Sequence, residues 1–339
     1  MQAINVILQR LIDRHNLDQA DTTSVFDQLM NGKYTQAQVA AVLVALRIKG
    51  ETVEELAGAA ASMRHHAVFI DAGGRQVVDT CGTGGDGMGT FNVSTTAAFI
   101  VAGAGVPVAK HGNRSITSQC GSADVLRALG VDIEAPPDVM ETCIREAGIG
   151  FLFAPSLHPA MSYVAPVRRE LGVRTVFNML GPLTNPAGAK GQVLGVFAPE
   201  LTEMFAQVLR LLGSQRAFIV HGKDGLDEIT TTTTTRISEL RAGKVLTYEF
   251  DPLPLLDQYA APGDLKGGDP AKNAVITKAI LDGERGAPRD IACINAAAAI
   301  VAGGKAADIT AGFAMAQESI DSGRARTALD KLIAVSNQP

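Results

Sequence analysis

The sequence contains no tryptophan, and aromatic residues make up only 5% of its 339 residues. Stacking platforms for nucleobases or sugars are therefore poorly supported. The chain also has no basic excess, because its formal net charge is −5 at pH 7. This balance argues against a general nucleic-acid-binding surface. We therefore expect a small-molecule ligand.

Cysteine is scarce, and the four cysteines form no C-x-x-C pair: they are Cys81, Cys120, Cys143 and Cys293. This spacing suggests neither a disulfide framework nor a zinc site, and reduced thiols are the norm in the cytosol. The N-terminus has no basic region ahead of a long apolar run, and no segment approaches the roughly 18 apolar residues of a membrane span. We expect a cytoplasmic protein.

The composition that remains is that of a globular α/β protein. Hydrophobic residues make up 46% of the chain, charged residues 19%, and there are 35 glycines. Such glycine usage suits a fold with many tight turns. The length allows one large domain or two of ordinary size.

Residues 1–72 have helical periodicity and no strand signal. Val6, Leu8, Leu11 and Ile12 form one apolar stripe, as on one face of a helix. Thr52 and Glu55 have the spacing of a capping box, which marks a helix start. We predict a small all-helical domain over residues 1–72, followed by a linker at 71–74.

From Val77 onward, short apolar segments alternate with helical patterns. We expect strands at 106–109, 131–133, 150–153, 193–197 and 217–220, and a β segment in the run of threonines at 230–235. This alternation predicts a large α/β domain over residues 73–339, with a mostly parallel central sheet covered on both faces. Ligands of such sheets bind at the carboxyl ends of the strands.

A glycine-rich segment, residues 79–87, lies between an expected strand and an expected helix. Glycine allows positive φ and lets backbone N–H groups approach an anion. The helix start adds unpaired N–H groups, and Asn92, Ser94 and Thr95 offer caps and donors. Asp86 would repel a phosphate, so it fits ribose hydroxyls or a metal-bound water better. A glycine-rich tight turn is the alternative, but the combination favours an anion site that is neither a Walker loop nor a dinucleotide motif.

Three further stretches carry candidate binding residues. Residues 110–118, just after a strand, offer cations, hydroxyls and an amide that can hold a phosphate,. Asp227 and Glu228 follow another strand in a glycine-bracketed loop, where both can reach a Mg2+ ion unless they form only a solvated turn. Arg168 precedes a Gly-Pro turn at 181–182 and could bind a carboxylate, although most arginines do not.

Together these stretches resemble the anthranilate phosphoribosyltransferase family over nearly the whole chain. The most specific elements are GTGGDG at 82–87, FNVST at 91–95, KHGNRS at 110–115, VRRELGVRTVFNMLGPLTNP at 167–186 and HGKDGLDEI at 221–229. The resemblance implies transfer of the phosphoribosyl group of phosphoribosyl diphosphate (PRPP) to the amine of anthranilate, in tryptophan biosynthesis. It also implies Mg2+ as the cofactor.

The resemblance further implies the roles of individual residues, and it requires no general acid or base. The PRPP-binding residues would be Gly82, Gly85, Asp86, Thr90, Asn92, Val93, Ser94, Thr95, Lys110, His111, Gly112, Asn113, Arg114, Ser115, Ile116, Thr117, Ser118 and Ser122. Anthranilate would contact Gly82, Asn113 and Arg168. Mg2+ would be held by Ser94, Asp227 and Glu228.

The family pattern also implies a homodimer, and a small domain completed by a segment near 160–182 and hinged to the large one. One departure is visible. After Asp227 and Glu228 the family usually shows a Thr-Gly-Pro-Thr turn, whereas this chain continues with threonines through Thr235. We expect this loop to differ locally.

Two other functions fit parts of the sequence. A pyrimidine-nucleoside phosphorylase would share the fold class, but it needs inorganic phosphate and no diphosphate-chelating metal, so the acidic pair counts against it. A non-catalytic, nucleic-acid-binding paralogue would need a basic surface and eroded loops, and the sequence has neither.

Overall fold

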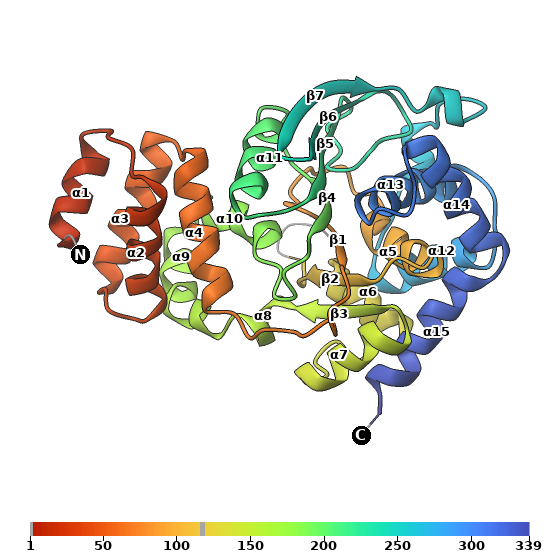
Figure 1. Ribbon diagram of the computed structural model, residues 1–339, viewed down its shortest axis with the longest axis horizontal. Coiled ribbons are helices and arrows are strands. Elements are labelled where there is room, and N and C mark those ends of the chain that lie inside the picture. Colours follow the sequence, from red (N-terminus) through yellow and green to blue (C-terminus); the bar gives the residue numbers. More distant parts are fainter. Residues whose placement is uncertain (1–2, 116–118, 339) are drawn as a thin grey trace.

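The computed structural model describes residues 3–115 and 119–338. Figure 1 shows a group of N-terminal helices on one side, a twisted sheet in the centre and the C-terminal helices on the other side. The N-terminus lies at the far end of the helical group, whereas the C-terminus lies at the bottom of the view, below the last helix.

The N-terminal part is entirely helical. Its helices are α1 (Ile4–Ile12), α2 (Gln19–Met30), α3 (Gln36–Lys49) and α4 (Val53–His65). Complete capping boxes start two of them, Thr35 with Gln38 at α3 and the predicted pair Thr52 with Glu55 at α4. Such boxes satisfy N–H groups that a helix start leaves unpaired.

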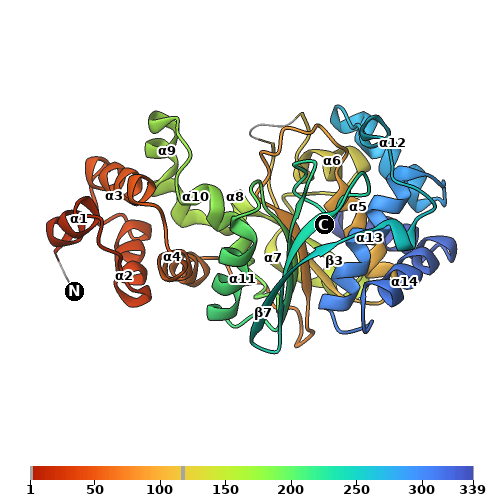
Figure 2. The ribbon, with the colours of Figure 1, turned by 90° about the horizontal axis from the view of Figure 1, so that it is seen from above.

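A later segment of the chain returns to these helices. It contains η1 (Pro159–Tyr163), α9 (Ala165–Leu171), α10 (Phe177–Leu180) and η2 (Gly181–Leu183). Helix α9 packs on α3 and α10 packs on α4, as Figure 2 shows from above. The Phe177 ring lies 5.8 Å from the Phe26 ring, centroid to centroid. The return segment therefore shares the apolar core of the helical part.

A seven-stranded sheet forms the centre of the molecule, in the order β3-β2-β1-β4-β5-β6-β7. Its strands are β1 (Val78–Gly82), β2 (Val108–Gly112), β3 (Ile149–Phe153), β4 (Gly191–Gly195), β5 (Arg216–Gly222), β6 (Thr235–Arg241) and β7 (Lys244–Phe250). The pairings are parallel from β3 to β5, and only β6 and β7 are added in antiparallel fashion. The mostly parallel sheet predicted from the sequence is confirmed.

Helices cover both faces of this sheet. Helices α5 (Val93–Gly103) and α13 (Ala287–Ala302) pack on one face, and α11 (Leu201–Leu211) packs on the other and also touches α4. Nearly every residue of α13 is buried, because it lies between the sheet and α14. The remaining elements are α6 (Ser122–Leu129), α7 (Pro137–Glu146), α8 (Ala154–Leu157), α12 (Pro270–Leu281), α14 (Ile309–Asp321), α15 (Arg324–Ser336), η3 (Leu253–Leu255) and η4 (Pro262–Leu265).

Two expected strands are wrong. Residues 131–133 form a loop after α6, in which Val131 and Ile133 are buried while the Asp132 carboxylate accepts a hydrogen bond from the Glu134 N–H. Residues 230–234 also form a loop, and only Thr235 belongs to β6. Within the described part of the chain, no helix has the length and apolar character needed to cross a membrane.

Candidate active site

The strand order places a ligand-binding position at the ends of β1 and β4. Because β1 lies between β2 and β4, the chain leaves its neighbourhood in opposite directions on the two sides. Ligands of open α/β sheets bind at such a switch point, outside the carboxyl ends of the strands. The glycine-rich loop begins at this end of β1 and runs into α5.

Four glycines give this loop its shape. Gly84, Gly85, Gly87 and Gly89 have φ values of 64, 81, 71 and 67°. L-amino acids with a side chain rarely adopt this region. The backbone conformation that the glycine pattern predicted is confirmed.

The acidic pair after β5 contacts this loop directly. The Gly84 N–H donates to Oδ2 of Asp227 at 2.8 Å, and the Ser94 N–H, at the start of α5, donates to Oε1 of Glu228 at 3.0 Å. Three segments that are remote in sequence therefore meet at one point.

This close approach depends on two glycines at strand ends. A Cβ on Gly82 would lie 2.6 Å from Oδ2 of Asp227, and a Cβ on Gly195 would lie 1.6 Å from the Asp227 carbonyl oxygen. A larger residue at position 82 would displace the Asp227 carboxylate, and one at position 195 would require the Asp227 backbone to move.

Burial and mutual repulsion shift the ionisation of this cluster. Burial and the neighbouring Asp86 raise the pKa of Asp227 to about 7. Burial and Asp227 raise the pKa of Glu228 to about 8, while Lys110 opposes the rise. Both acidic side chains keep part of their surface open to solvent. The cluster is thus an accessible site that favours an added cation.

The carboxylate oxygens of Asp227 and Glu228 are ligands that suit Mg2+, and a bound cation would balance their negative charge. Among the residues that the structure describes, no group of three or more histidine, cysteine, aspartate or glutamate side chains is arranged to hold a metal ion alone. Mg2+ typically binds through one or two carboxylates together with water and substrate phosphates. Asp227 and Glu228 fit this shared kind of site.

Lys110 lies beneath the loop rather than on it. Its side chain is buried, and Nζ donates to the Thr80 carbonyl oxygen and approaches Oγ of Ser94 at 3.5 Å. Burial lowers the pKa of this ammonium, whereas Asp79 and Glu228 act to raise it. The structure therefore places Lys110 as an internal counterion of the carboxylates.

His111 is buried in a hydrogen-bonded network. Its Nδ1 lies 3.2 Å from the Gly181 carbonyl oxygen, and its Nε2 lies 3.2 Å from Nε2 of His158. Its backbone N–H donates to Asp79, whose other oxygen accepts from Asn185 at 2.8 Å. Burial lowers the pKa values of His111 and His158 to about 3 and about 4. Both imidazoles are neutral near pH 7.

The residues that follow β2 form a neighbouring loop. The Asn113 N–H donates to Oγ of Ser122 at 3.2 Å, and the Ser115 N–H donates to Asp124. The Arg114 guanidinium forms an ion pair with Glu134 at 2.8 Å. Position 112 has no room for a side chain, because a Cβ on Gly112 would clash with Oγ of Ser122. The expected site residues Ile116, Thr117 and Ser118 lie outside the described residues.

The start of α5 differs from the expected capping. Asn92 occupies the cap position, but its side chain donates to the Cys120 carbonyl oxygen instead of accepting from the helix. Glu228 accepts from the Ser94 N–H in its place. The Thr95 hydroxyl is buried and has no hydrogen-bond partner among the described residues. Thr90 forms an isolated bridge with Lys266, and Val93 is buried at the helix start.

Arg168 lies on α9, in the return segment. Its guanidinium stands over the Phe177 ring, 5.4 Å from the centroid, and burial lowers its pKa. In the described structure no hydrogen bond or ion pair joins Arg168 to Asp227, Glu228 or the glycine-rich loop.

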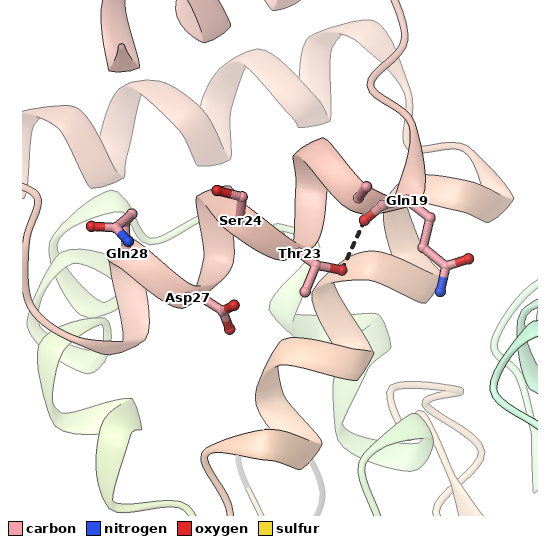
Figure 3. Close-up of a pocket in the computed structure, with 6 residues that line it drawn as sticks. Gln19, Thr23, Ser24, Asp27 and Gln28 are labelled. Carbon is pink, nitrogen blue, oxygen red and sulfur yellow. Dashed lines mark hydrogen bonds between the residues drawn. The ribbon is translucent and has the colours of Figure 1, made fainter. Parts of the chain in front are cut away.

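A hollow of ≈ 550 Å³ lies elsewhere, along α2. Figure 3 shows its lining residues and the bond from the Thr23 hydroxyl to the Gln19 carbonyl oxygen, 2.8 Å long. Helix α4 separates α2 from α11 and the sheet (Figure 1). The hollow is open and mostly lined by uncharged residues, so the strand-end cluster remains the better candidate.

Some residues of the cluster were missed in the sequence. Asp79 begins the glycine-rich segment and Asn185 is the penultimate residue of the 167–186 motif, yet their hydrogen bond links β1 to a segment over a hundred residues away. For Gly195, the one sequence feature that pointed to the cluster was its position near the end of an expected strand. His158 had no signal, because it lies between α8 and η1, whereas its partner His111 lies on β2, 47 residues earlier in the chain.

Comparisons with known proteins agree with this architecture. The model of the glycosyl transferase family, a/b domain, matches residues 74–326, and the model of its helical bundle domain matches residues 5–67. The anthranilate phosphoribosyltransferase of Desulfosudis oleivorans is 57% identical over 96% of both chains. That of Syntrophobacter fumaroxidans is 55% identical over 98% of both.

Solved structures show the same fold. The Thermus thermophilus anthranilate phosphoribosyltransferase superimposes with a TM-score of 0.92 at 43% identity, covering 98% of this chain and 99% of that one. The Saccharomyces cerevisiae enzyme in complex with PRPP and Mg superimposes with a TM-score of 0.87 at 29% identity, covering 98% and 97%. These relatives give no support to the phosphorylase or the non-catalytic alternative. The chain belongs to the anthranilate phosphoribosyltransferase family.

Proposed function

We propose that the strand-end cluster is the active site at which this enzyme transfers the phosphoribosyl group of PRPP to the amine of anthranilate. The products are N-(5-phosphoribosyl)anthranilate and diphosphate. One observation carries the proposal: Asp227 and Glu228 converge on the N–H groups of Gly84 and Ser94. A glycine loop, a helix start and a carboxylate pair at one point suit a sugar diphosphate and its cation.

The backbone of the glycine-rich loop and the start of α5 would bind the phosphates of PRPP. Gly82, Gly85, Thr90 and the residues from Asn92 to Thr95 lie along this path. The unpartnered hydroxyl of Thr95 supports this role, because a buried polar group normally has a partner. Asp86 would accept ribose hydroxyls, and residues 110–118 with Ser122 would complete the PRPP site.

Ser94, Asp227 and Glu228 would hold the Mg2+ that accompanies PRPP. The bound ion would neutralise the charge that develops on diphosphate as the C–O bond breaks. Backbone N–H groups of the glycine-rich loop would add hydrogen bonds to the same developing charge. Lys110 beneath the cluster limits the repulsion among the carboxylates.

No protein base is required in this mechanism. The arylamine of anthranilate attacks the anomeric carbon as the neutral amine, and positioning of the two substrates supplies much of the rate. His111 and His158 hydrogen-bond each other, which suits a role in orientation. Gly82, Asn113 and Arg168 would contact anthranilate, with Arg168 facing its carboxylate.

The same proposal includes the organisation of the chain. Residues 1–72 with the segment near 160–182 would form a small domain hinged to the domain of residues 73–339, and the shared apolar core of these segments supports this division. The packed helices α1 and α3 expose Val6, Ile12 and Ile48, which suits a homodimer through this domain. We place the enzyme in the cytoplasm.

A direct assay tests the function. The protein is incubated with anthranilate, PRPP and Mg2+, and the loss of anthranilate fluorescence is followed. We expect turnover that needs both substrates and stops on chelation of Mg2+. Turnover with inorganic phosphate and a pyrimidine nucleoside instead would contradict the proposal.

A further inference from the structure

Arg174 connects three segments around the glycine-rich loop. Its guanidinium stands over the Phe197 ring, 4.6 Å from the centroid, and its Nη2 lies 3.4 Å from the Gly85 carbonyl oxygen, to which it donates. Phe197 follows β4, Gly85 follows β1, and Arg174 itself belongs to the return segment between α9 and α10. One exposed side chain thus reaches across the switch point.

The backbone around Arg174 is fixed on both sides. Gly172 ends α9 with a φ of +62°, a conformation that suits glycine at this position. Thr175 is buried, and it exchanges hydrogen bonds with Asn178, from its N–H to Oδ1 at 2.9 Å and from the Asn178 N–H to its carbonyl oxygen at 2.9 Å. The guanidinium is therefore held near the loop both by the fixed backbone around Arg174 and by its stacking on Phe197.

The charge of Arg174 is not neutralised within the described residues. No carboxylate there lies within ion-pair distance of its guanidinium, whereas Arg114, which follows β2, pairs with Glu134. Glycine at position 85 leaves room for the Arg174 side chain, since a Cβ there would lie 2.7 Å from Nη2. The contact with Gly85 uses one of five guanidinium N–H groups, so others remain for an anion.

We infer that Arg174 is a further substrate-binding residue, which donates to a phosphate oxygen of the sugar diphosphate seated on the glycine-rich loop. This inference rests on the function proposed above. A planar guanidinium, held flat by an aromatic ring, suits phosphate oxygens. Because Arg174 comes from the return segment, it would add a donor from a third part of the chain to those of the glycine-rich loop and α5.

Three variants test this role: Arg174→Ala, Arg174→Lys and the matched control Arg169→Ala. Arg169 is an exposed arginine on α9, so its removal changes the net charge equally. Binding of inorganic diphosphate with Mg2+ is measured by calorimetry, and kcat and both KM values by the fluorescence assay. For Arg174→Ala we expect about tenfold weaker diphosphate binding and a similar rise in the KM for PRPP, as for one lost charged hydrogen bond. The KM for anthranilate at saturating PRPP stays unchanged, Arg174→Lys is intermediate, and Arg169→Ala matches the wild type.

Two results would overturn the inference. The first is that Arg174→Ala binds diphosphate as tightly as the wild type. The second is that only the KM for anthranilate rises in this variant. If Arg174→Ala melts at a lower temperature, Arg174→Lys decides the question, because it keeps the charge and the aliphatic stem. A wild-type protein that neither binds diphosphate with Mg2+ nor turns over would instead refute the proposed function itself.

Discussion

Asp227 and Glu228 occupy the donors that a phosphate would use. In the structure they accept from the N–H groups of Gly84 and Ser94, so the polar groups of the site satisfy one another. The arrangement gathers negative charge, and burial together with the nearby Asp86 raises the pKa of Asp227. This negative charge is unfavourable for the fold, and it is what would favour a cation at the proposed site.

Glu228→Gln should therefore stabilise the metal-free protein and weaken its function. The pKa of Glu228 in the fold is about 8, above its ordinary value, so the folded state favours the protonated acid. The wild type loses this stability as the pH rises from about 4.5 through 8, because ionisation is easier in the unfolded chain. Glutamine does not ionise and keeps an oxygen for the Ser94 N–H. We expect a gain of about 1 kcal/mol or more at the alkaline end, measured by urea unfolding with a chelator.

The same variant should lose Mg2+-dependent binding of diphosphate in calorimetry, and most of its turnover. Glu249→Gln is the control, since this exposed carboxylate pairs with Lys223 at the surface. If the metal-free stability of Glu228→Gln falls with rising pH as steeply as in the wild type, the carboxylate does not ionise as described.

At the scale of single residues, the sequence indicates which side chains could form the proposed site, but not how deeply each one is buried. Asp227 and Glu228 could be identified from their type and their loop. Lys110 was expected at the ligand, yet its ammonium is buried against the Thr80 carbonyl. Whether a lysine faces solvent or the interior depends on the layer packed above it, which no local pattern encodes.

At the scale of the elements, the first turn of α5 is hydrogen-bonded to a side chain from the loop that follows β5. Glu228 accepts from the Ser94 N–H, and the chain reaches this point only because β4 ends in Gly195. The Asp227 carbonyl oxygen fills the space in which a side chain at position 195 would start.

Gly195→Ala should displace the Asp227 loop. Its Cβ would lie 1.6 Å from the Asp227 carbonyl oxygen, so the backbone must move and both carboxylates lose their places. We expect a loss of stability of about 1–3 kcal/mol, as for other overpacked sites, together with near-complete loss of Mg2+-dependent diphosphate binding. Thermal melts and calorimetry measure the two effects.

The matched control is Gly263→Ala in η4, where nothing lies within 4 Å of an added Cβ. Its stability should differ little from that of the wild type. Equal stability and binding in both alanine variants would show that the Asp227 loop adjusts freely, contrary to the tight packing described here.

Elements with strong periodicity were predicted well, whereas short runs were not. The strands near 108–112, 149–153 and 216–222 follow apolar segments of ordinary strand length. The run at 131–133 is apolar because Val131 and Ile133 are buried in a loop, not because they pair with a strand. Threonines 230–234 favour β structure by propensity, but the hydroxyls of Thr230 and Thr232 donate to Asp224 at 2.6 and 2.5 Å instead. Local side-chain bonds of this kind compete with strand pairing.

Over the whole molecule, the helical part and the sheet share one apolar cluster. It runs from Phe26 and Leu43 through Phe177 to Phe205 and Ile219. The sequence predicted both parts and the return segment, but not that α11 joins them. Arg168 lies on the helical side of this junction, and the strand ends lie on the other.

Arg168→Ala should therefore act on one substrate only. If Arg168 binds the carboxylate of anthranilate, its loss raises the KM for anthranilate about tenfold or more and leaves diphosphate binding unchanged. An analogue without the carboxylate, such as aniline, should be used equally by the variant and the wild type. A change in diphosphate binding would place Arg168 on the PRPP side instead.

The buried pair of His111 and His158 should make the molecule sensitive to acid. His111 lies on β2 and also contacts the Gly181 carbonyl oxygen, while His158 lies between α8 and η1, so the pair sits where the return segment leaves the sheet. Burial holds their folded-state pKa values at about 3 and about 4, below the ordinary value. As the pH falls through about 6.5, the unfolded chain binds protons that the folded chain does not, so stability falls by up to about 1.4 kcal/mol per pH unit for each histidine.

Replacing one partner should reduce this acid sensitivity. His158→Asn keeps a donor toward His111 but removes one titrating imidazole, so the decline of the unfolding free energy between pH 6.5 and about pH 4 should become shallower. His15→Asn, at an exposed position, should retain the wild-type slope. Urea unfolding at several pH values in this window measures all three proteins. An unchanged slope for His158→Asn would mean that its imidazole takes up a proton in the folded protein, which requires that the junction between the return segment and β2 open before the chain unfolds.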